Sequence, residues 1–266
     1  MTAYPCAKIN LGLYITERRS DGYHNLQTVF YPIPLCDKLE VEESEKDSLE
    51  LVGIHIEGNS GDNLVLRALN LLRQKGHAIP PLHIQLTKHI PTGAGLGGGS
   101  SDAAFMLCLL NEKFALGLAV HELETLAASL GADCPFFIQC RPILAQGIGN
   151  EFTSIPVDLS GWFLVLIKPD DFISTKEAYA RVVPRTPACN LQEVIAQDPS
   201  VWKDALSNDF EESLFPTHPA IADIKAELYR QGAVYAAMSG SGSSVFGLFK
   251  EEADITTSDF HFSCRL

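Results

Sequence analysis

The sequence predicts a fold that mixes β-strands and α-helices and is divided into two domains. An alternating segment, a glycine-rich segment and a helical segment follow one another over residues 82–113. Residues 162–167 are entirely apolar and come after proline and Ser-Gly punctuation, a pattern typical of a strand that begins a new domain. The chain has 266 residues and is 46% hydrophobic, which is enough for a sizeable core and for two domains.

The composition argues against several classes of protein. The net charge of −13 disfavours nucleic-acid and membrane-surface partners, so a polyanionic ligand would need a local positive field. No apolar run reaches ~18 residues and the N-terminus lacks a signal-peptide pattern, so we expect a cytoplasmic protein without a membrane partner. Seven cysteines without a C-x-x-C motif indicate neither a disulfide framework nor a zinc site, and reduced thiols are typical of the cytosol.

The first predicted element is a strand over residues 4–16. Its alternation places Lys8 and Asn10 on one face and Ile9 and Leu11 on the other. Taken from the strand alone, the polar pair is more simply explained as solvent-facing than as part of a site.

A turn at residues 20–22 is followed at once by Tyr23 and His24. A phenol ring and an imidazole in a loop could stack on a planar base and hydrogen-bond to it, and a plain surface turn explains them equally well. Apolar residues then predict short strands within 26–33, 39–41, 49–51 and 54–56.

Helices and one more strand follow. A helix is predicted over residues 64–75, because its apolar residues recur at helical spacing, Asp62 or Asn63 can cap it and Gly76 can end it. Residues 82–87 alternate as a half-buried strand. The spacing after residue 101 predicts a helix that begins near Ser100, and residues 120–130 predict another.

The central feature is the segment 91–101, PTGAGLGGGSS, which joins that strand to the next helix. Its glycines lack Cβ atoms, so the main chain can take positive φ and its N–H groups can converge on an anion. The helix N-terminus that follows adds free N–H groups and the positive end of a dipole. This order of elements predicts a polyphosphate site.

Other glycine-rich loops fit the segment less well. No lysine follows the glycines, so it is not a Walker A loop, and the downstream motifs of protein kinases are missing. Gly93, Gly95 and Gly98 match G-x-G-x-x-G, but the region ~20 residues further on is helical, which argues against a dinucleotide site. A flexible linker is disfavoured because a strand and a helix flank the segment directly.

Asp133 stands alone between a helix end and the apolar run Pro135-Phe136-Phe137. Its neighbours predict that the carboxylate is partly buried and needs partners. Two interpretations stay open, a turn aspartate and a carboxylate that acts on a hydroxyl.

The second half of the chain begins after Pro156 with the apolar strand 162–167. A short helix carrying Tyr179 and a helix over 219–231 are predicted next. Residues 239–244, SGSGSS, join two further strands as a hairpin. This loop has more small residues than a tight turn needs, so we expect it to face a ligand.

Three stretches, in this order, resemble the GHMP kinase superfamily: AKINLGL at 7–13, PTGAGLGGGSSDAA at 91–104 and MSGSGSSVFGLF at 238–249. Residues 18–33, 131–138 and 208–211 add to the resemblance, which covers nearly the whole chain. It implies an α+β fold of two domains. An ATP-binding N-terminal domain would cover 1–156 and a ferredoxin-like C-terminal domain 157–266, with the active site in the cleft between them.

The resemblance also implies an activity. The protein would be an ATP-dependent small-molecule kinase with Mg²⁺ bridging the phosphate oxygens, and its acceptor would be a polyol linked to cytidine diphosphate. A kinase of the homoserine or mevalonate type and a catalytically silent nucleotide-binding module are the alternatives. A monomer and a homodimer both fit, and no metal ligand is identified.

The residues that match the family's motifs are assigned as follows. The catalytic pair falls on Lys8 and Asp133. The ATP site comprises Asn63 and Lys88 near the adenosine and, at the phosphates, Pro91, Thr92, Gly93, Ala94, Gly95, Leu96, Gly97, Gly98, Gly99, Ser100 and Ser101. The substrate site comprises Tyr23, His24 and Tyr179 at the cytidine and, on the acceptor side, Asn10, Gly240 and Ser241.

Overall fold

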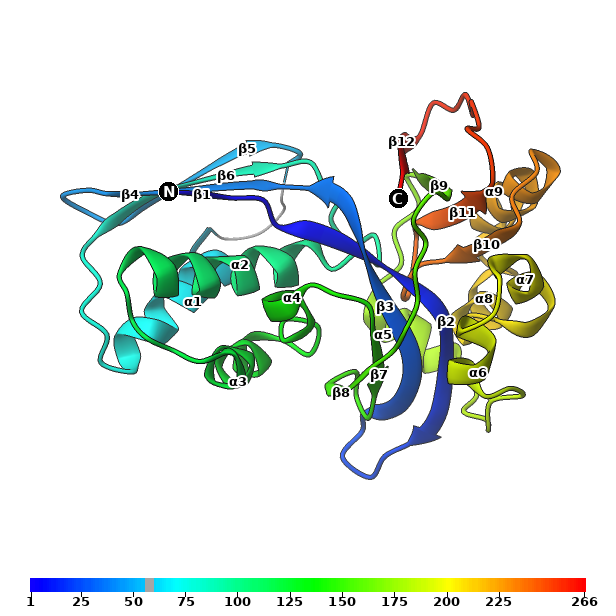
Figure 1. Cartoon of the computed structure of the whole chain (residues 1–266), viewed down its shortest axis with the longest axis horizontal. Helices are drawn as coiled ribbons and strands as arrows, with labels where there is room; N and C mark the ends of the chain where they lie inside the picture. The colour runs from blue at the N-terminus through cyan, green and yellow to red at the C-terminus, as the bar shows by residue number, and fades with distance from the viewer. Residues whose placement is uncertain (56–59) are drawn as a thin grey trace. The chain divides into compact units, whose positions relative to one another are not determined.

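The computed structural model describes residues 1–55 and 60–266, and these form two compact units (Figure 1). Unit 1 contains residues 1–7, 35–92 and 97–141, and unit 2 contains residues 8–34, 93–96 and 142–266. Both units combine sheets with helices, as the α+β class requires. The boundary after residue 156 and the cleft between domains stay predictions.

Unit 1 is built on a four-stranded sheet with the order β1-β4-β6-β5 (Figure 1). The strands β1 (Thr2–Ala3), β4 (Lys38–Glu43) and β6 (Leu82–Lys88) pair antiparallel, and β5 (Ser48–Gly53) pairs parallel to β6. Ile54 and His55, which belong to the expected 54–56 strand, do not lie in a strand, because the chain turns at Gly53, where φ is +85°. Ile56 lies outside the described residues.

The helices of unit 1 are η1 (Ser60–Asp62), α1 (Leu64–Gln74), α2 (Gly98–Lys113), α3 (Val120–Leu130) and α4 (Phe136–Gln139). α1, α2 and α3 share one apolar core with strands β4 and β6 of the sheet, and Ile138 of α4 packs against it. α2 carries buried residues on several faces, including Ala103, Leu107 and Leu110, which is typical of a helix inside a core. The N-terminal end of α2 is therefore fixed by packing along the whole helix.

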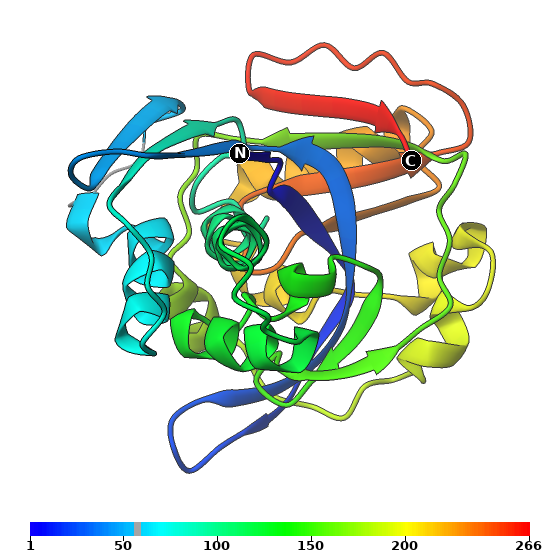
Figure 2. The same cartoon turned by 60° about the vertical axis from the view of Figure 1, so that its left-hand side comes forward.

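Unit 2 contains two four-stranded sheets, with the orders β2-β3-β7-β8 and β10-β11-β9-β12 (Figure 2). The first consists of β2 (Cys6–Arg18), β3 (His24–Cys36), β7 (Ile143–Gln146) and β8 (Glu151–Ser154). The second is antiparallel and consists of β9 (Phe163–Lys168), β10 (Tyr235–Met238), β11 (Val245–Phe249) and β12 (Phe260–Arg265). The edge strand β12 was not predicted from the sequence.

The helices of unit 2 are α5 (Thr175–Arg181), α6 (Leu191–Ile195), η2 (Pro199–Val201), α7 (Trp202–Ala205), α8 (Asp209–Leu214) and α9 (Pro219–Arg230). Residues of α5, α8 and α9 pack with β9, β10 and β11 in one core. This packing places the start of α8 beside the loop between β10 and β11.

The cysteines differ in part from expectation. The sulfur atoms of Cys6 and Cys140 lie in contact, so the fold places two cysteines together that the sequence did not relate. The fold brings them together across 134 residues of sequence, a distance that no local pattern reveals. Cys36, Cys108, Cys134, Cys189 and Cys264 are free. Over the described residues, the helices are too short or too polar for any of them to cross a membrane.

Candidate active site

The predicted polar pair on β2 is buried. Lys8 and Asn10 are 3% and 2% exposed, so the solvent-facing interpretation was wrong. The ammonium group of Lys8 donates hydrogen bonds to Asn10 Oδ1 at 2.7 Å and to the carbonyl oxygen of Gly95 at 2.8 Å. It also lies 5.1 Å from the ring centre of Phe30. These two hydrogen bonds fix the position of the buried ammonium group.

Two residues that sequence reasoning missed hold this pair in place. Thr28 on β3 accepts a hydrogen bond from Asn10 Nδ2 at 2.9 Å and donates to Gly12 O at 2.5 Å. Ser239 Oγ donates to Gly95 O at 3.0 Å. Thr28 is fully buried, and its signal in the sequence was a hydroxyl inside an apolar strand. Asn10 therefore has one rotamer in which it can accept from Lys8.

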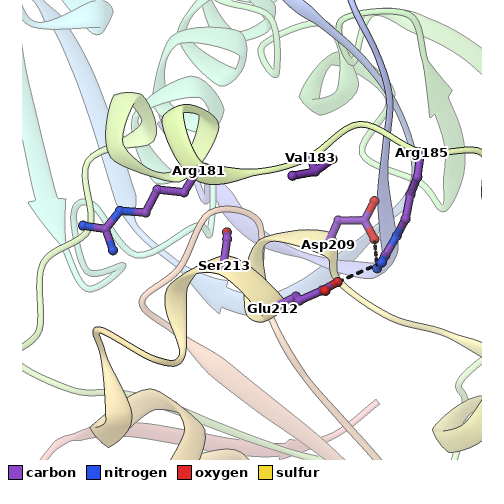
Figure 3. Close-up of a pocket in the computed structure, with 6 residues that line it drawn as sticks. All are labelled: Arg181, Val183, Arg185, Asp209, Glu212 and Ser213. Atoms are coloured by element: carbon purple, nitrogen blue, oxygen red, sulfur yellow. Dashed lines mark hydrogen bonds and ion pairs between the residues drawn. The ribbon is translucent and has the colours of Figure 1, made fainter.

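A pocket of about 400 Å³ opens beside α5 and α8 (Figure 3). Its lining residues are Arg181, Val183, Arg185, Asp209, Glu212 and Ser213. Arg185 pairs with Asp209 at 3.0 Å and with Glu212 at 2.8 Å, so carboxylates of the protein balance its charge. None of these lining residues is a predicted site residue, and we assign no ligand to this pocket.

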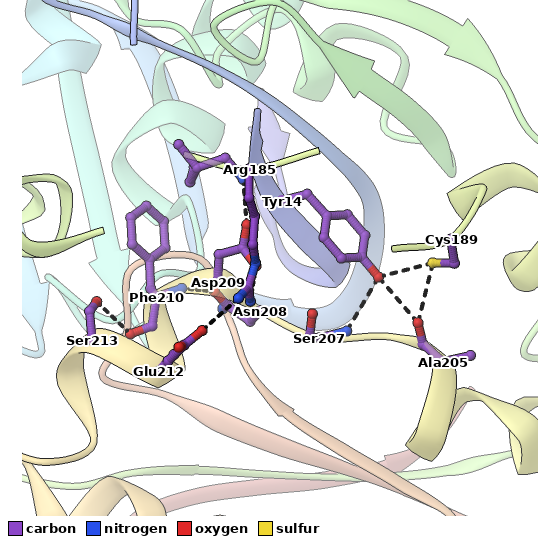
Figure 4. Close-up of polar contacts among 11 residues, drawn as sticks. Tyr14, Arg185, Cys189, Ala205, Ser207, Asn208, Asp209, Phe210, Glu212 and Ser213 are labelled. Carbon is purple, nitrogen blue, oxygen red and sulfur yellow. Dashed lines mark hydrogen bonds and ion pairs between the residues drawn. The ribbon is translucent and has the colours of Figure 1, made fainter. Parts of the chain in front are cut away.

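β2 fixes the start of α8 through main-chain and side-chain contacts (Figure 4). Leu13 N donates to Ser207 O at 2.8 Å, and Ile15 N donates to Asp209 Oδ2 at 2.8 Å. The hydroxyl group of Tyr14 donates to Ala205 O at 3.3 Å, and burial raises the pKa of this phenol, so it stays protonated. These bonds hold Asn208 between the two anchored neighbours.

Asn208 in turn holds the SGSGSS loop. Its Nδ2 atom donates to Met238 O and to Gly240 O, both at 2.8 Å, while its Oδ1 atom caps α8 by accepting from Phe210 N at 3.0 Å. Glu211 Oε1 accepts from Met238 N at 2.7 Å. The predicted hairpin of β10 and β11 is confirmed, and its loop residues Gly240 and Ser241 follow this anchored point.

The tip of the glycine-rich segment belongs to unit 2 and requires glycine. Gly93 and Gly95 have φ values of +60° and +73°, which L side chains rarely adopt. A Cβ atom at Gly95 would lie 1.9 Å from Ser239 O, and one at Gly93 would lie 2.7 Å from the ring of Phe172. The tip therefore lies directly against the SGSGSS loop and against Phe172, which the sequence analysis did not single out.

The remainder of the segment belongs to unit 1 and starts α2. The helix begins at Gly98, earlier than the predicted start near Ser100, and no side chain caps it. Gly97 has a φ of +73° at the N-cap position. An uncapped N-terminus leaves main-chain N–H groups for a ligand, as the polyphosphate prediction requires.

The turn that carries Asp133 lies against this helix start. A Cβ atom at Gly131 would meet Cys134 Sγ at 3.2 Å and Ser100 Oγ at 3.9 Å. Burial raises the pKa of the Cys134 thiol to about 11, so this sulfur is a neutral neighbour. Asp133 is partly buried, as predicted, and α3, α4 and α2 fix its turn within unit 1. Its pairing with Lys8 stays a prediction.

Two of the predicted cytidine residues lie together in unit 2. The rings of His24 and Tyr179 have centroids 5.1 Å apart and planes tilted by 32°, and Phe210 packs edge-on against Tyr179 at 5.0 Å. Tyr23 is 62% exposed beside them in sequence. Burial and then the Arg18 charge lower the pKa of His24, so its imidazole is neutral near pH 7 and can both donate and accept.

Asn63 and Lys88, which were expected near the adenosine, already have partners in unit 1. Asn63 caps α1 by accepting from Val65 N at 2.9 Å. Lys88 is 2% exposed and its ammonium bonds to Asp37 and Asp102. Their contact with a nucleotide stays a prediction.

No group of three or more His, Cys, Asp or Glu side chains placed to hold a metal ion occurs within residues 1–55 and 60–266. A metal ion bound through nucleotide phosphates would not need such a group. The chain therefore offers a buried ammonium, an uncapped helix start, a partly buried carboxylate and an aromatic pair, which are the parts that phosphoryl transfer to a base-linked alcohol requires.

Comparison with protein families gives two matches. The model of the GHMP kinases N terminal domain matches residues 63–141, and the model of the GHMP kinases C terminal domain matches residues 190–257. Together they cover more than half of the chain.

Curated relatives match over almost their full length. A protein of Bacteroides thetaiotaomicron named 4-diphosphocytidyl-2-C-methyl-D-erythritol kinase is 56% identical over 264 residues, which is 98% of this chain and 96% of the relative. A protein of Parabacteroides distasonis with the same name is 49% identical over 266 residues, which is 100% of this chain and 98% of the relative.

Solved structures show the same fold. A crystal structure of 4-(cytidine 5'-diphospho)-2C-methyl-D-erythritol kinase has a TM-score of 0.79 and 33% identity, covering 93% of this chain and 90% of that one. Mevalonate kinase from Methanococcus jannaschii has a TM-score of 0.71 at 16% identity, covering 100% of this chain and 98% of that one, and shows the fold alone.

Proposed function

Because this chain belongs to the GHMP kinase family, we propose that it transfers the γ-phosphoryl group of ATP to the 2-hydroxyl of 4-diphosphocytidyl-2-C-methyl-D-erythritol, a step of the non-mevalonate isoprenoid pathway. The observation that carries the choice of acceptor is the ring pair of His24 and Tyr179, next to the exposed Tyr23. An acceptor with a cytosine base can use such aromatic groups, whereas homoserine and mevalonate have no base to stack.

The nucleotide is proposed to bind at residues 91–101. Main-chain N–H groups of the loop and of the uncapped α2 would hold the phosphates, and Asn63 would lie near the adenosine. Mg²⁺, bound to the phosphate oxygens, would neutralise part of their charge. Ser100 and Ser101 place hydroxyl groups in the first turn of α2, where they can add to the main-chain donors.

The reaction is proposed to use Asp133 and Lys8. The acceptor oxygen forms a bond to the γ-phosphorus, the bond from that phosphorus to the β,γ-bridging oxygen breaks, and ADP leaves. Asp133 accepts the hydroxyl proton or orients the hydroxyl, and the ammonium group of Lys8 stabilises the charge that develops. The hydrogen bonds of Lys8 to Asn10 and Gly95 support this role, because they fix where the ammonium group lies.

The acceptor is tested by measuring ADP release with a panel of alcohols. We expect turnover with the cytidyl acceptor and none with homoserine or mevalonate. Turnover with either of those instead would favour another kinase of this family, and nucleotide binding without ADP release under any acceptor would favour a silent binding module.

The catalytic pair is tested with Asp133→Asn. We expect turnover to fall about 10²- to 10⁴-fold, the usual contribution of a general base. Asp158→Asn is the matched control, because Asp158 is an exposed turn aspartate that accepts a hydrogen bond from Ser160 N at 2.8 Å. Near-normal turnover of Asp133→Asn would refute the assignment.

We also propose a cytoplasmic enzyme, as a monomer or homodimer.

A further inference from the structure

A buried cluster of three charged groups lies beneath the phosphate end of α2. Lys88 at the end of β6, Asp37 between β3 and β4, and Asp102 in α2 are 2%, 0% and 3% exposed. Lys88 Nζ donates to Asp37 Oδ2 and, at 2.6 Å, to Asp102 Oδ2. Charged groups this deeply buried are costly unless paired, so the cluster needs a reason beyond stability alone.

Asp37 fixes the chain just before the glycine-rich segment. Its Oδ1 atom accepts hydrogen bonds from His89 N at 2.6 Å and from Ile90 N at 2.8 Å. Its own N–H donates to Pro5 O at 2.9 Å. One carboxylate therefore holds the two residues that directly precede Pro91.

Asp102 fixes the chain just after the segment. It lies in the second turn of α2, and a Cβ atom on the first helical residue, Gly98, would lie 3.4 Å from Lys88 Nζ. The ammonium group thus lies directly under the start of the helix. Asp102 Oδ1 is buried and has no hydrogen-bond partner in the described part of the chain.

We propose that Lys88 is a positioning residue for nucleotide binding, which joins the two ends of residues 91–97 through Asp37 and Asp102. The ammonium group acts on the phosphates indirectly, by setting where the α2 N–H groups point, and does not bind the nucleotide itself. The inference rests on the proposed phosphate site at residues 91–101. It replaces the expected contact of Lys88 with the adenosine by a role that its two carboxylate partners explain.

The charge of the cluster is sensitive to pH. The pKa of Asp102 is raised to about 7 in all: burial raises it most, the charge of Lys88 lowers it and the charge of Asp37 raises it. Lys88 and Asp37 are the charged groups that face this carboxyl. A polyphosphate at the start of α2 adds negative charge nearby, which favours the protonated form of Asp102. Nucleotide binding should therefore take up a proton near neutral pH and weaken as the pH rises above 7.

The test measures the affinity of the full chain for a non-hydrolysable ATP analogue with Mg²⁺, so it needs no acceptor. Lys88→Met should weaken binding about 10-fold or more, because it leaves two buried carboxylates without their cation. Lys88→Met combined with Asp102→Asn should bind better than Lys88→Met alone, because the coupled charge is removed. Lys113→Met, which removes an ammonium from the far end of α2, should leave the affinity unchanged.

The isosteric variant Asp102→Asn keeps the test decisive if Lys88→Met does not fold. The affinity of Asp102→Asn for the analogue should not change with pH around 7 as the wild-type affinity does. Protonation of the analogue itself affects both proteins equally, so it does not contribute to the difference between them. The proposal is overturned if the double variant loses affinity for the analogue by the product of the factors lost in Lys88→Met and in Asp102→Asn. It is also overturned if the wild type and Asp102→Asn show the same dependence of affinity on pH. Failure of the proposed phosphate site looks different, because the wild-type protein would then not bind the analogue at all; a wrong acceptor assignment would appear only in the ADP-release panel and would leave analogue binding intact.

Discussion

Gly95→Ala is the sharpest perturbation that the glycine-rich segment offers. The added methyl group would lie 1.9 Å from Ser239 O and 3.2 Å from Gly242 O, and the residue would keep a φ of +73°. Real Cβ atoms essentially never approach another atom within 3.0 Å, so the tip must move away from the SGSGSS loop by about 1 Å. The mutation therefore moves the tip, with its Gly95 carbonyl oxygen, away from the Ser239 hydroxyl group that donates to it.

The magnitude follows from the contacts that would be lost. A left-handed conformation costs alanine about 1–2 kcal/mol relative to glycine. The Gly95 carbonyl oxygen accepts from Lys8 Nζ at 2.8 Å and from Ser239 Oγ at 3.0 Å. A charged and a neutral hydrogen bond are worth about 2 and about 1 kcal/mol, so we expect a loss of roughly 4 kcal/mol in the free energy of unfolding.

Urea denaturation and steady-state kinetics measure the two consequences. A shift of about 1 Å at a catalytic group can cost 10²-fold, so kcat/KM should fall at least that far. Gly99→Ala is the matched control for stability, because its Cβ would lie 3.8 Å from Leu64 Cδ1, an ordinary contact, within a helix. If Gly95→Ala unfolds at the same urea concentration as Gly99→Ala, the close approach to Ser239 is wrong.

Three further results are expected. Asn208→Ala should lower the free energy of unfolding about 2 kcal/mol more than Asn190→Ala, because both cap helices but only Asn208 donates to two buried carbonyls; equal urea midpoints would contradict this. Tyr179→Ala should raise the KM for the cytidyl acceptor about 10-fold and leave the KM for ATP unchanged, with Tyr179→Phe near normal, because the ring supplies the contact; a change in the ATP constant instead would oppose the assignment. The pKa of Asp102 is raised in the folded state, so between about pH 4 and 7 the folded protein keeps a proton on this carboxyl that the unfolded chain has lost, and the free energy of unfolding falls as the pH rises through that window. Asp102→Asn should remove this pH dependence from the free energy of unfolding. An unchanged pH dependence would show that Asp102 is not its source.

Much of the fold and part of the site follow from local patterns. The strand 82–87, the helix after residue 101 and the hairpin around 239–244 were all predicted, because alternation and helical spacing record which face of an element is buried. The glycines at 93, 95 and 97 take positive φ, a property of residues without a Cβ atom that needs no distant partner.

Other features were predicted incompletely because they depend on distant residues. Alternation on β2 correctly put Lys8 and Asn10 on one face, but the assumption that a polar face meets solvent was wrong. The partners of that face come from β3 and from the loop after Met238, and no pattern within residues 4–16 refers to them. Thr28 and Ser239 were missed for the same reason.

By itself, the sequence determined the order of elements, the conformational freedom of the segment 91–101 and the fact that a helix begins directly after it. Each of these depends on neighbours only a few residues apart. Only the tertiary structure decided that Lys88 is paired with Asp37 and Asp102, 51 and 14 residues away, and that Cys6 meets Cys140. Burial sets the difference: the cost of removing a charge from water depends on every group packed around it, and these groups come from several strands and helices.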